Sequence, residues 1–332
     1  MMRRKTWKSC IAVCFERPRC PGNPKEKCQN LRKMRLPDLH IRWFCCLLNF
    51  RIHCKRKELD NDMTSVYVVA HKTFDFYKYN LDSCYKVIRV GKYSEDQSGL
   101  GISDSTGDNI AIKNPNYCEL TALYWIWKND TASEIKGLCH YRRYFMKSKI
   151  STDSECILSE KDVQTFLKDH DAIVSATEVF SCGNYEEYLR CGHQKDLDLT
   201  KEAISVLFPD YLKTYEEEFE HGNRLNGFNM LIAKKNIFDA YCEWLFAVLN
   251  YVEERLDISS YTAQEARVYG YLSERLLRVW LRYNNVKCKE CRVINTEDKK
   301  NLKFYTREIL EVLGLFNFGK GLSYKLRGKQ RK

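Results

Sequence analysis

The sequence lacks a long apolar run. Its best candidate for a membrane span, Trp43 to Phe50, is eight residues long and is flanked by Arg42 and Arg51. A helix that crosses a bilayer needs about 20 apolar residues, so we predict no transmembrane helix. A secretory signal pattern is also missing. The simplest interpretation of the 16 cysteines is therefore that they are reduced thiols in a cytosolic protein.

Several well-known catalytic and cofactor motifs are absent. Neither GxxxxGKS/GxxxxGKT nor GxGxxG follows the first expected strand, which argues against kinases, ATPases and dinucleotide-dependent oxidoreductases. The sequence contains no GxSxG elbow and no HExxH. Cys288-x2-Cys291 has no second cysteine pair near it, so we do not expect a structural zinc site.

Excess positive charge is confined to one end of the chain. The whole chain carries +11, but residues 1–57 alone hold 16 Lys and Arg against three acids, a net +13. The remainder is therefore near neutral, at −2, and charge gives no reason to expect that it binds nucleic acid. We interpret residues 1–62 as a basic, Cys-rich extension that is poorly ordered or lies upstream of a native start at Met63.

Strand and helix patterns alternate after residue 62. Together they predict an α/β domain with a mixed sheet. The expected strands are Ser65–Ala70, a segment ending at His140, Ala172–Ala176 and Phe228–Ala233. The expected helices are one capped by Asn114 and running through Trp127, one over residues 159–169, one capped by Asn236, and one opened by a Thr262/Glu265 capping box. Residues 91–113 are predicted to form a long loop, which is a common place for function.

One motif stands out at the end of an expected strand. In GLCHYRRYF, residues 137–145, the apolar run ends in His140, Tyr141, Arg142, Arg143 and Tyr144. Ligands of open α/β sheets bind outside the carboxyl ends of strands, and two adjacent guanidiniums suit phosphate or carboxylate oxygens. The alternative is a surface arginine pair stacked on its own tyrosines.

Seven motifs occur in an order that resembles a known family. They are VYVVAHK (66–72), TGDNI (106–110), KNPNYCELTALYWIWKN (113–129), GLCHYRRYF (137–145), FNMLI (228–232), YCEWLF (241–246) and ARVYGYLSERLL (266–277). Together they resemble the domain of unknown function numbered 4422, whose members are associated with bacterial capsule and exopolysaccharide synthesis and look like GT-A glycosyltransferases. The resemblance implies a GT-A-like, Rossmann-type mixed sheet flanked by helices, with a helical C-terminal half. It places the glycosyltransferase-like domain at residues 63–295 and a basic tail at 296–332.

The resemblance also implies an activity. A cytoplasmic enzyme of this kind would move a sugar from a nucleotide-diphosphate donor, a UDP-sugar first of all, to a glycan or lipid-linked oligosaccharide. Hexosyl and galactofuranosyl transfer both stay open. The alternative is a catalytically silent nucleotide-sugar or carbohydrate-binding protein on the same fold, because fold alone does not establish activity.

Candidate site residues follow from these motifs. An inverting transfer needs a base for the acceptor hydroxyl, and Asp196, placed in an expected loop, is the first candidate, with Glu265 and Glu274 behind it. The structural alternatives are a capping role for Glu265 and an ion pair with Arg267 or Arg278 for Glu274. The expected donor-binding residues are His71, Lys72, Asp108, Asn109, His140, Arg142 and Arg143. Those expected to contact the acceptor or the sugar are His193, Asn229 and Arg267.

Metal dependence is a further expectation. Many GT-A enzymes hold the diphosphate through a cation bound by Asp-x-Asp, but the corresponding strand here ends in His140-Tyr-Arg-Arg-Tyr. Two guanidiniums can offset roughly the −2 charge of a diphosphate, so we predict that no metal is required. The alternative is Mg or Mn held by Asp196 and Asp198, because the triplets Asp60/Asp62 and Asp169/Asp171 precede the fold or a strand.

The last residues of the chain are strongly basic. Residues 320–332 contain six Lys and Arg and no acid. They are interpreted either as a solvated, frayed terminus or as a segment attracted to anionic lipid headgroups at the inner face of the plasma membrane.

Overall fold

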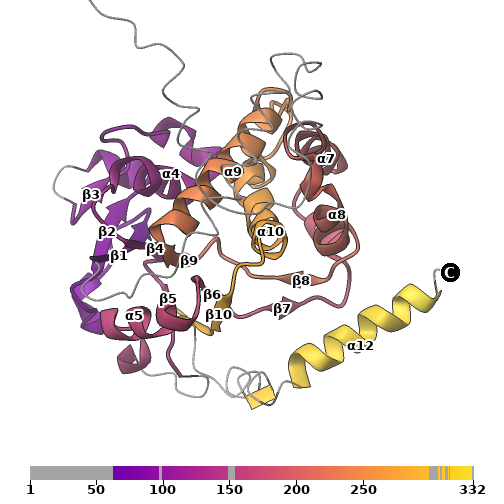
Figure 1. The fold of residues 1–332 in the computed structure, drawn as a ribbon. Coiled ribbons are helices and arrows are strands. Elements are labelled where there is room, and N and C mark those ends of the chain that lie inside the picture. Colours follow the sequence, from indigo (N-terminus) through magenta and orange to yellow (C-terminus); the bar gives the residue numbers. More distant parts are fainter. Residues whose placement is uncertain are drawn as a thin grey trace, which may run out of the picture. The chain divides into compact units, whose positions relative to one another are not determined.

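The computed structural model describes residues 63–96, 99–148, 154–298, 306, 309–310, 313 and 315–330. Within these residues a twisted sheet lies between helices (Figure 1). The extension predicted at residues 1–62 lies outside the described residues.

The central sheet has the strand order β10-β6-β9-β4-β1-β2-β3, and β5 joins β4 to β11. Its strands are β1 Thr64–Ala70, β2 Tyr85–Arg89, β3 Ile102–Ser103, β4 Ile135–His140, β5 Arg143–Phe145, β6 Ala172–Ser175, β9 Leu231–Lys234, β10 Cys288–Cys291 and β11 Val293–Asn295. A separate antiparallel pair consists of β7 Glu178–Val179 and β8 Arg224–Leu225.

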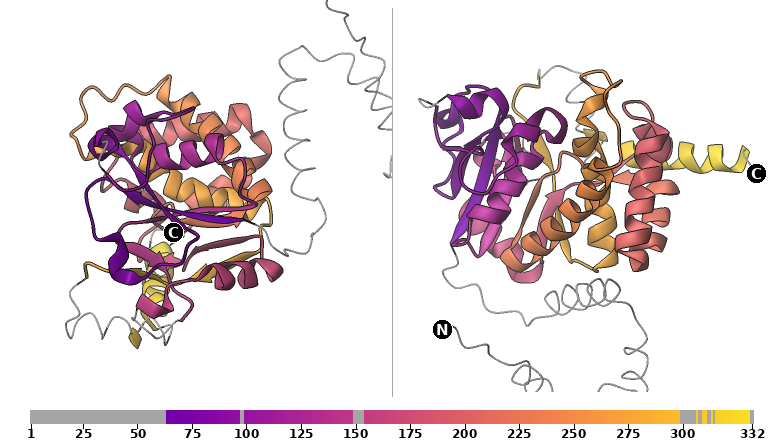
Figure 2. Two further views of the ribbon diagram at one scale, coloured as in Figure 1. Left: turned by 90° about the vertical axis from the view of Figure 1, so that its left-hand side faces the viewer. Right: turned by 90° about the horizontal axis from the view of Figure 1, so that it is seen from above.

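The described helices cover both faces of the sheet (Figure 2). They are α3 Asn114–Tyr117, α4 Leu120–Asn129, α5 Glu160–Asp169, α6 Asn184–Tyr188, α7 Gln194–Leu207, α8 Leu212–Tyr215, α9 Lys235–Glu253, α10 Val268–Tyr283 and α12 Leu315–Gln330. Short 3-10 turns occupy Phe76–Tyr79, Gly91–Glu95, Ala111–Lys113, Ser154–Cys156, Pro209–Tyr211 and Glu265–Arg267, and Glu216–Glu220 form a π-helical turn. α5 packs on β6 and β9, whereas α9 packs on β4 and β9. Helices α4, α7 and α10 in turn pack against α9.

Burial explains why the first strand is so apolar. All seven residues of β1 are buried, as expected for a central parallel strand covered on both faces. Val66 and Val68 belong to the core cluster that includes Leu167 of α5, whereas the Tyr67 ring meets Trp125 of α4 on the other face. The expected strand at Ser65–Ala70 is confirmed, and so are those of β4 and β6.

Strand direction determines where loops meet. β1, β2, β3 and β4 are parallel, and β9 runs antiparallel between β4 and β6. The amino end of β9 therefore lies at the same edge as the carboxyl ends of β4 and β6. The segment that enters β9 faces His140 for this reason.

Two sequence predictions for this region are wrong. The helix expected from Asn114 through Trp127 is broken at Cys118, which has a φ of 52° and separates α3 from α4. The strand expected from Phe228 begins only at Leu231. Phe228 and Asn229 have φ values of 74° and 52°, which no β-strand accommodates.

Three helix starts also differ from the prediction. α9 begins at Lys235 and is preceded by Lys234, so Asn236 is not its N-cap. The Thr262/Glu265 capping box exists, but it closes the 3-10 turn before α10. Asp196 does not lie in a loop; it occupies the first turn of α7.

The basic tail contains a helix. A frayed terminus was one of the two interpretations of this segment. α12 extends from Leu315 to Gln330 and contacts β7. None of the helices in the described part of the chain is both long and apolar enough to cross a membrane.

Candidate functional site

Four segments meet at the carboxyl edge of the sheet. His140 ends β4, Gly227–Asn229 lead into β9, Gly270–Glu274 lie in the first turns of α10, and Glu119 immediately precedes α4. Hydrogen bonds connect all four segments.

The backbone of Phe228 is held from two sides. His140 Nε2 lies 2.8 Å from the Phe228 carbonyl oxygen, and the Phe228 N–H donates to Glu274 Oε1 at 2.9 Å. Non-glycine residues rarely adopt positive φ and do so mainly where surrounding contacts impose it. These two bonds, with those of the next residue, hold Phe228 and Asn229 in the left-handed region.

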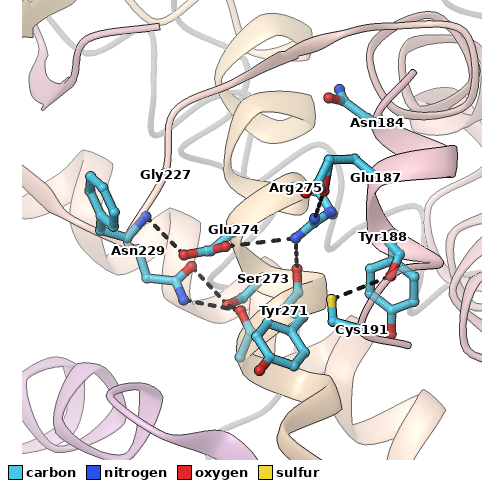
Figure 3. Close-up of polar contacts among 12 residues, drawn as sticks. Asn184, Glu187, Tyr188, Cys191, Gly227, Asn229, Tyr271, Ser273, Glu274 and Arg275 are labelled. Carbon is cyan, nitrogen blue, oxygen red and sulfur yellow. Dashed lines mark hydrogen bonds and ion pairs between the residues drawn. The ribbon is translucent and has the colours of Figure 1, made fainter. Parts of the chain in front are cut away.

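Asn229 is buried and uses its whole amide (Figure 3). Its Nδ2 donates to Glu119 Oε1 at 2.7 Å and to the Gly270 carbonyl at 3.1 Å, and its Oδ1 accepts from Ser273 Oγ at 2.8 Å. The predicted contact of Asn229 with a sugar is therefore not available to its amide without breaking this network. Its position instead fixes the loop against α4 and α10.

Glu274 has one oxygen engaged by the loop and one facing a cation. Its Oε2 lies 3.6 Å from Arg275 Nη1, and Arg275 pairs in turn with Glu187 at 3.3 Å (Figure 3). The alternative that Glu274 pairs with Arg267 or Arg278 is not what the structure contains, because Arg278 pairs with Glu218. Burial raises the pKa of Glu274, and that of Glu119, above its ordinary value.

The two arginines of the strand-end motif have different partners. Arg142 pairs with Glu297 at 2.8 Å, and Lys72 approaches the same carboxylate at 3.5 Å. The Arg143 guanidinium lies over the Phe228 ring, 4.6 Å from its centroid, and forms no ion pair with any described residue. Arg267 donates from Nε to Cys118 Sγ at 3.2 Å and likewise meets no carboxylate within the described residues.

The two histidines at this edge are not cations at neutral pH. Burial lowers the pKa of His140 to about 4, so its imidazole is neutral and donates from Nε2 to the Phe228 carbonyl. Burial also lowers the pKa of His71, and Lys72, Arg142, Arg267 and His140 nearby lower it further. The positive charge of the site therefore comes from its arginines and Lys72.

Asp196, the first candidate for a base, lies in a separate cluster. It is fully buried and accepts from the Tyr188 hydroxyl at 2.9 Å, from the His193 N–H at 2.8 Å and from the Tyr261 hydroxyl. These bonds anchor the start of α7, which favours a structural role, and a catalytic role for Asp196 stays a prediction. His193 also pairs with Glu265 at 3.1 Å, and Glu265 caps the turn before α10 as its structural alternative predicted.

Asp108 and Asn109 lie away from the other predicted donor residues. Asn129, at the C-terminal end of α4, bonds both the Asp108 N–H and its carbonyl. Asn109 bonds within its own loop, to the carbonyls of Ser105 and Gly107. Because Glu119 lies at the opposite end of α4, about 15 Å of helix separates these residues from the Asn229 network.

The Asp-x-Asp triplets within the described residues lie on other segments than the Asn229 loop. Asp171 precedes β6 at the opposite edge and pairs with Lys234, Asp196 accepts from three donors, and Asp198 lies exposed on α7. Asp60 and Asp62 lie outside the described residues. Among the described residues, no three His, Cys, Asp or Glu side chains are grouped so that they could hold a metal ion.

Three further residues contribute to the site and were not among the candidates from the sequence: Glu119, Phe228 and Ser273. Glu119 bonds Asn229 across 110 positions of the chain, a separation that no local pattern signals. Phe228 could have been found from the sequence. It follows Gly227 at the start of an expected strand, so its aromatic side chain lies where the chain enters that strand. No local pattern distinguishes Ser273 from a core position of α10.

Comparisons with known proteins agree with this architecture. The family model described as a domain of unknown function (DUF4422) matches residues 65–285. The apo structure of WbbM, a bifunctional glycosyltransferase, is similar with a TM-score of 0.63 and 29% identity, covering 72% of this chain. The match spans 46% of the WbbM chain, less than half of its length. No curated protein sequence matches the chain.

Both the predicted family and the predicted fold class are thereby confirmed. The mixed sheet with flanking helices is a glycosyltransferase-like fold, and the family match covers the strand-end motif, the Asn229 loop and the start of α10. This chain belongs to the family of the domain of unknown function DUF4422.

Proposed function

We propose that this protein is a glycosyltransferase that moves a sugar from a nucleotide-diphosphate donor to a glycan or lipid-linked acceptor. Its similarity to the WbbM structure supports a transferase of this class. The observation that carries the proposal lies at the carboxyl edge of an α/β sheet. There, two arginines that form no ion pair with any described residue occur together with a half-buried carboxylate.

Arg143 and Arg267 are the proposed ligands of the donor diphosphate. Arg142 belongs to the same motif, but its charge is already offset by Glu297. A charged guanidinium without an ion-pair partner gains most from an anionic ligand, because planar forks match phosphate oxygens. The exposed Phe228 ring beneath Arg143 would hold that guanidinium in place and offer an apolar face to the substrate.

Glu274 is the proposed general base. Its pKa is raised by burial, which makes its carboxylate a stronger base than an exposed glutamate. The Phe228 N–H and Arg275 orient it, so that it would accept the acceptor hydroxyl proton as the glycosidic bond forms. Glu119 would act as a positioning residue through Asn229.

Donor binding is proposed to require no metal, with Mg or Mn as the alternative. Two arginine charges can offset roughly the −2 charge of a diphosphate. Asp196 and Asp198, the residues that the alternative would use, lie on α7 rather than beside Arg143.

The test is nucleotide release by the full chain from UDP-, GDP- and dTDP-sugars, with and without a chelator. We expect turnover with one donor class and no loss on chelation. Arg143→Ala and Arg267→Ala should each raise the donor KM roughly 10- to 100-fold, since each removes a charge-assisted contact. Glu274→Gln should lower kcat by roughly 10²- to 10⁴-fold, because it removes the base.

The matched control is Arg282→Ala, on the same helix as Glu274 but exposed and paired with Glu218. It should leave both parameters unchanged. Donor binding without turnover would favour the silent binding protein on the same fold. Unchanged kinetics in the Arg143 and Arg267 variants would contradict the proposed clamp, and chelator sensitivity would favour the metal-dependent alternative.

A further inference from the structure

Helix α12 is attached to the rest of the chain through one polar side. Asn317 Nδ2 donates to the Thr177 carbonyl at 3.1 Å, Lys320 pairs with Glu178 at 3.1 Å, and the Tyr324 hydroxyl donates to the His221 carbonyl at 2.7 Å. These contacts hold the helix along β7 and the segment that leads to β8.

The opposite side of α12 presents apolar residues to solvent. Leu315, Phe318 and Leu322 are 52%, 69% and 49% exposed. Their spacing of three and four positions places them on one helix face, and exposed Lys325 continues the same row. A helix that packs on a core buries its apolar stripe, so α12 has the reverse of the usual arrangement.

Charge on this helix has a single sign. Residues 315–332 contain six Lys and Arg and no acid. A surface helix that combines an apolar face with basic residues is typical of segments that lie in the interface of a membrane, where anionic headgroups attract the charge. A second copy of α12 is a poor partner for this face, since pairing would bring the same positive charges together.

We propose that α12 binds the surface of an anionic lipid bilayer, with Leu315, Phe318 and Leu322 inserted among the acyl chains and Lys325 at the headgroups. This inference does not depend on the proposed function. It has a structural consequence for the site, because β8 ends at Leu225, two residues before the Gly227–Asn229 loop, and β7 follows the carboxyl end of β6. A helix docked on this strand pair brings the edge of the sheet that carries the Asn229 loop towards the bilayer.

The experiment is co-sedimentation of the full chain with vesicles of phosphatidylcholine that contain about 30% phosphatidylserine, at about 0.1 M salt. The test variant is Phe318→Ser/Leu322→Ser, which removes apolar surface and changes no charge. Residues 1–57, with their net charge of +13, are present in both proteins, so their own attraction to the vesicles cancels in the comparison. We expect the variant to bind roughly tenfold more weakly than the wild type.

Two controls make the result specific. Ile112→Ser/Val206→Ser removes two exposed apolar side chains elsewhere and should bind as the wild type does. Lys325→Gln should weaken binding, whereas Lys213→Gln, an exposed lysine on α8, should not. Equal binding by the wild type and the Phe318/Leu322 variant would overturn the proposal. So would a wild-type dimer, seen by sedimentation velocity without vesicles, that the same variant dissociates.

Far-ultraviolet circular dichroism and thermal unfolding of each variant test whether the substitution leaves the protein folded. The substituted side chains are exposed, so the folded state should persist and any loss of binding should come from the surface itself.

Discussion

At the scale of single residues, the same side-chain type has different roles according to its partners. Arg142 and Arg143 are adjacent in sequence, yet the first pairs with Glu297 and the second lies over the Phe228 ring. Asp196 is a buried acid and Glu274 a half-buried one; three donors engage Asp196, whereas Glu274 keeps an oxygen directed at Arg275. These differences come from contacts between distant parts of the chain, so composition and spacing could not predict them.

A buried acid outside the site gives a prediction about pH. Asp104 is fully buried, and burial raises its pKa to about 6, with Ser94 and Thr121 offsetting part of the effect. Because the folded state favours the neutral acid, Asp104 contributes stability that is present below its ordinary pKa of 3.8 and is lost as pH rises through about 6. Between about pH 4 and pH 7 the wild type should lose about 2 kcal/mol relative to Asp104→Asn.

Urea unfolding of both proteins across this pH range measures that difference. The two proteins can differ in unfolding free energy by a constant amount at every pH. Only the change of that difference with pH reports the ionisation of Asp104. Parallel curves for the two proteins would contradict the raised pKa.

At the scale of elements, the contact between β4 and β9 sets the position of the Asn229 loop. Gly137 of β4 faces Ile232 of β9, and a Cβ added there would lie 2.6 Å from both Ile232 Cγ1 and the Leu231 carbonyl oxygen. Because one obstacle is backbone, β9 would have to move. Gly137→Ala should therefore destabilise the protein by about 1 to 3 kcal/mol, as measured by urea unfolding.

The matched control is Gly319→Ala on α12, where an added Cβ meets nothing within 4 Å. Alanine in a helix is preferred over glycine by up to about 1 kcal/mol, so this change should be neutral or stabilising. A Gly137→Ala protein as stable as the wild type would contradict this prediction, because β9 would then have moved away from β4 with no loss of unfolding free energy.

At the scale of the whole molecule, residues 63–332 should fold without the preceding basic segment. The Met63 carbonyl accepts from the N–H groups of Glu134 and Ile135, and β1 is buried from its first residue, so contacts among the described residues hold the first strand from Met63 onward. A chain of residues 63–332 should unfold cooperatively in urea with the midpoint of the full chain. A chain that begins at residue 71, and so lacks β1, is the control and should not unfold cooperatively. Loss of cooperativity or activity in the 63–332 chain would contradict the prediction that the domain starts at Met63.

The sequence by itself determined the fold class and the family, and it predicted the edge of the sheet at which we place the site. Alternating apolar periods and caps are local signals, so they placed β1, β4, α5 and β6 nearly where the structure has them. The motif at residues 137–145 predicted a site at the carboxyl edge of the sheet, because the alternation of strands and helices indicates the direction of the strands.

Only the tertiary structure decided which residues act together there. The break at Cys118 and the left-handed Phe228 and Asn229 depend on partners from α4 and α10, and no local propensity favours them. Glu297 reaches Arg142 across 155 positions of the chain, and the three donors to Asp196 come from three separate segments. Side-chain charge and hydrogen bonding act over a few ångströms, so they are decided by which segments the folded chain brings together.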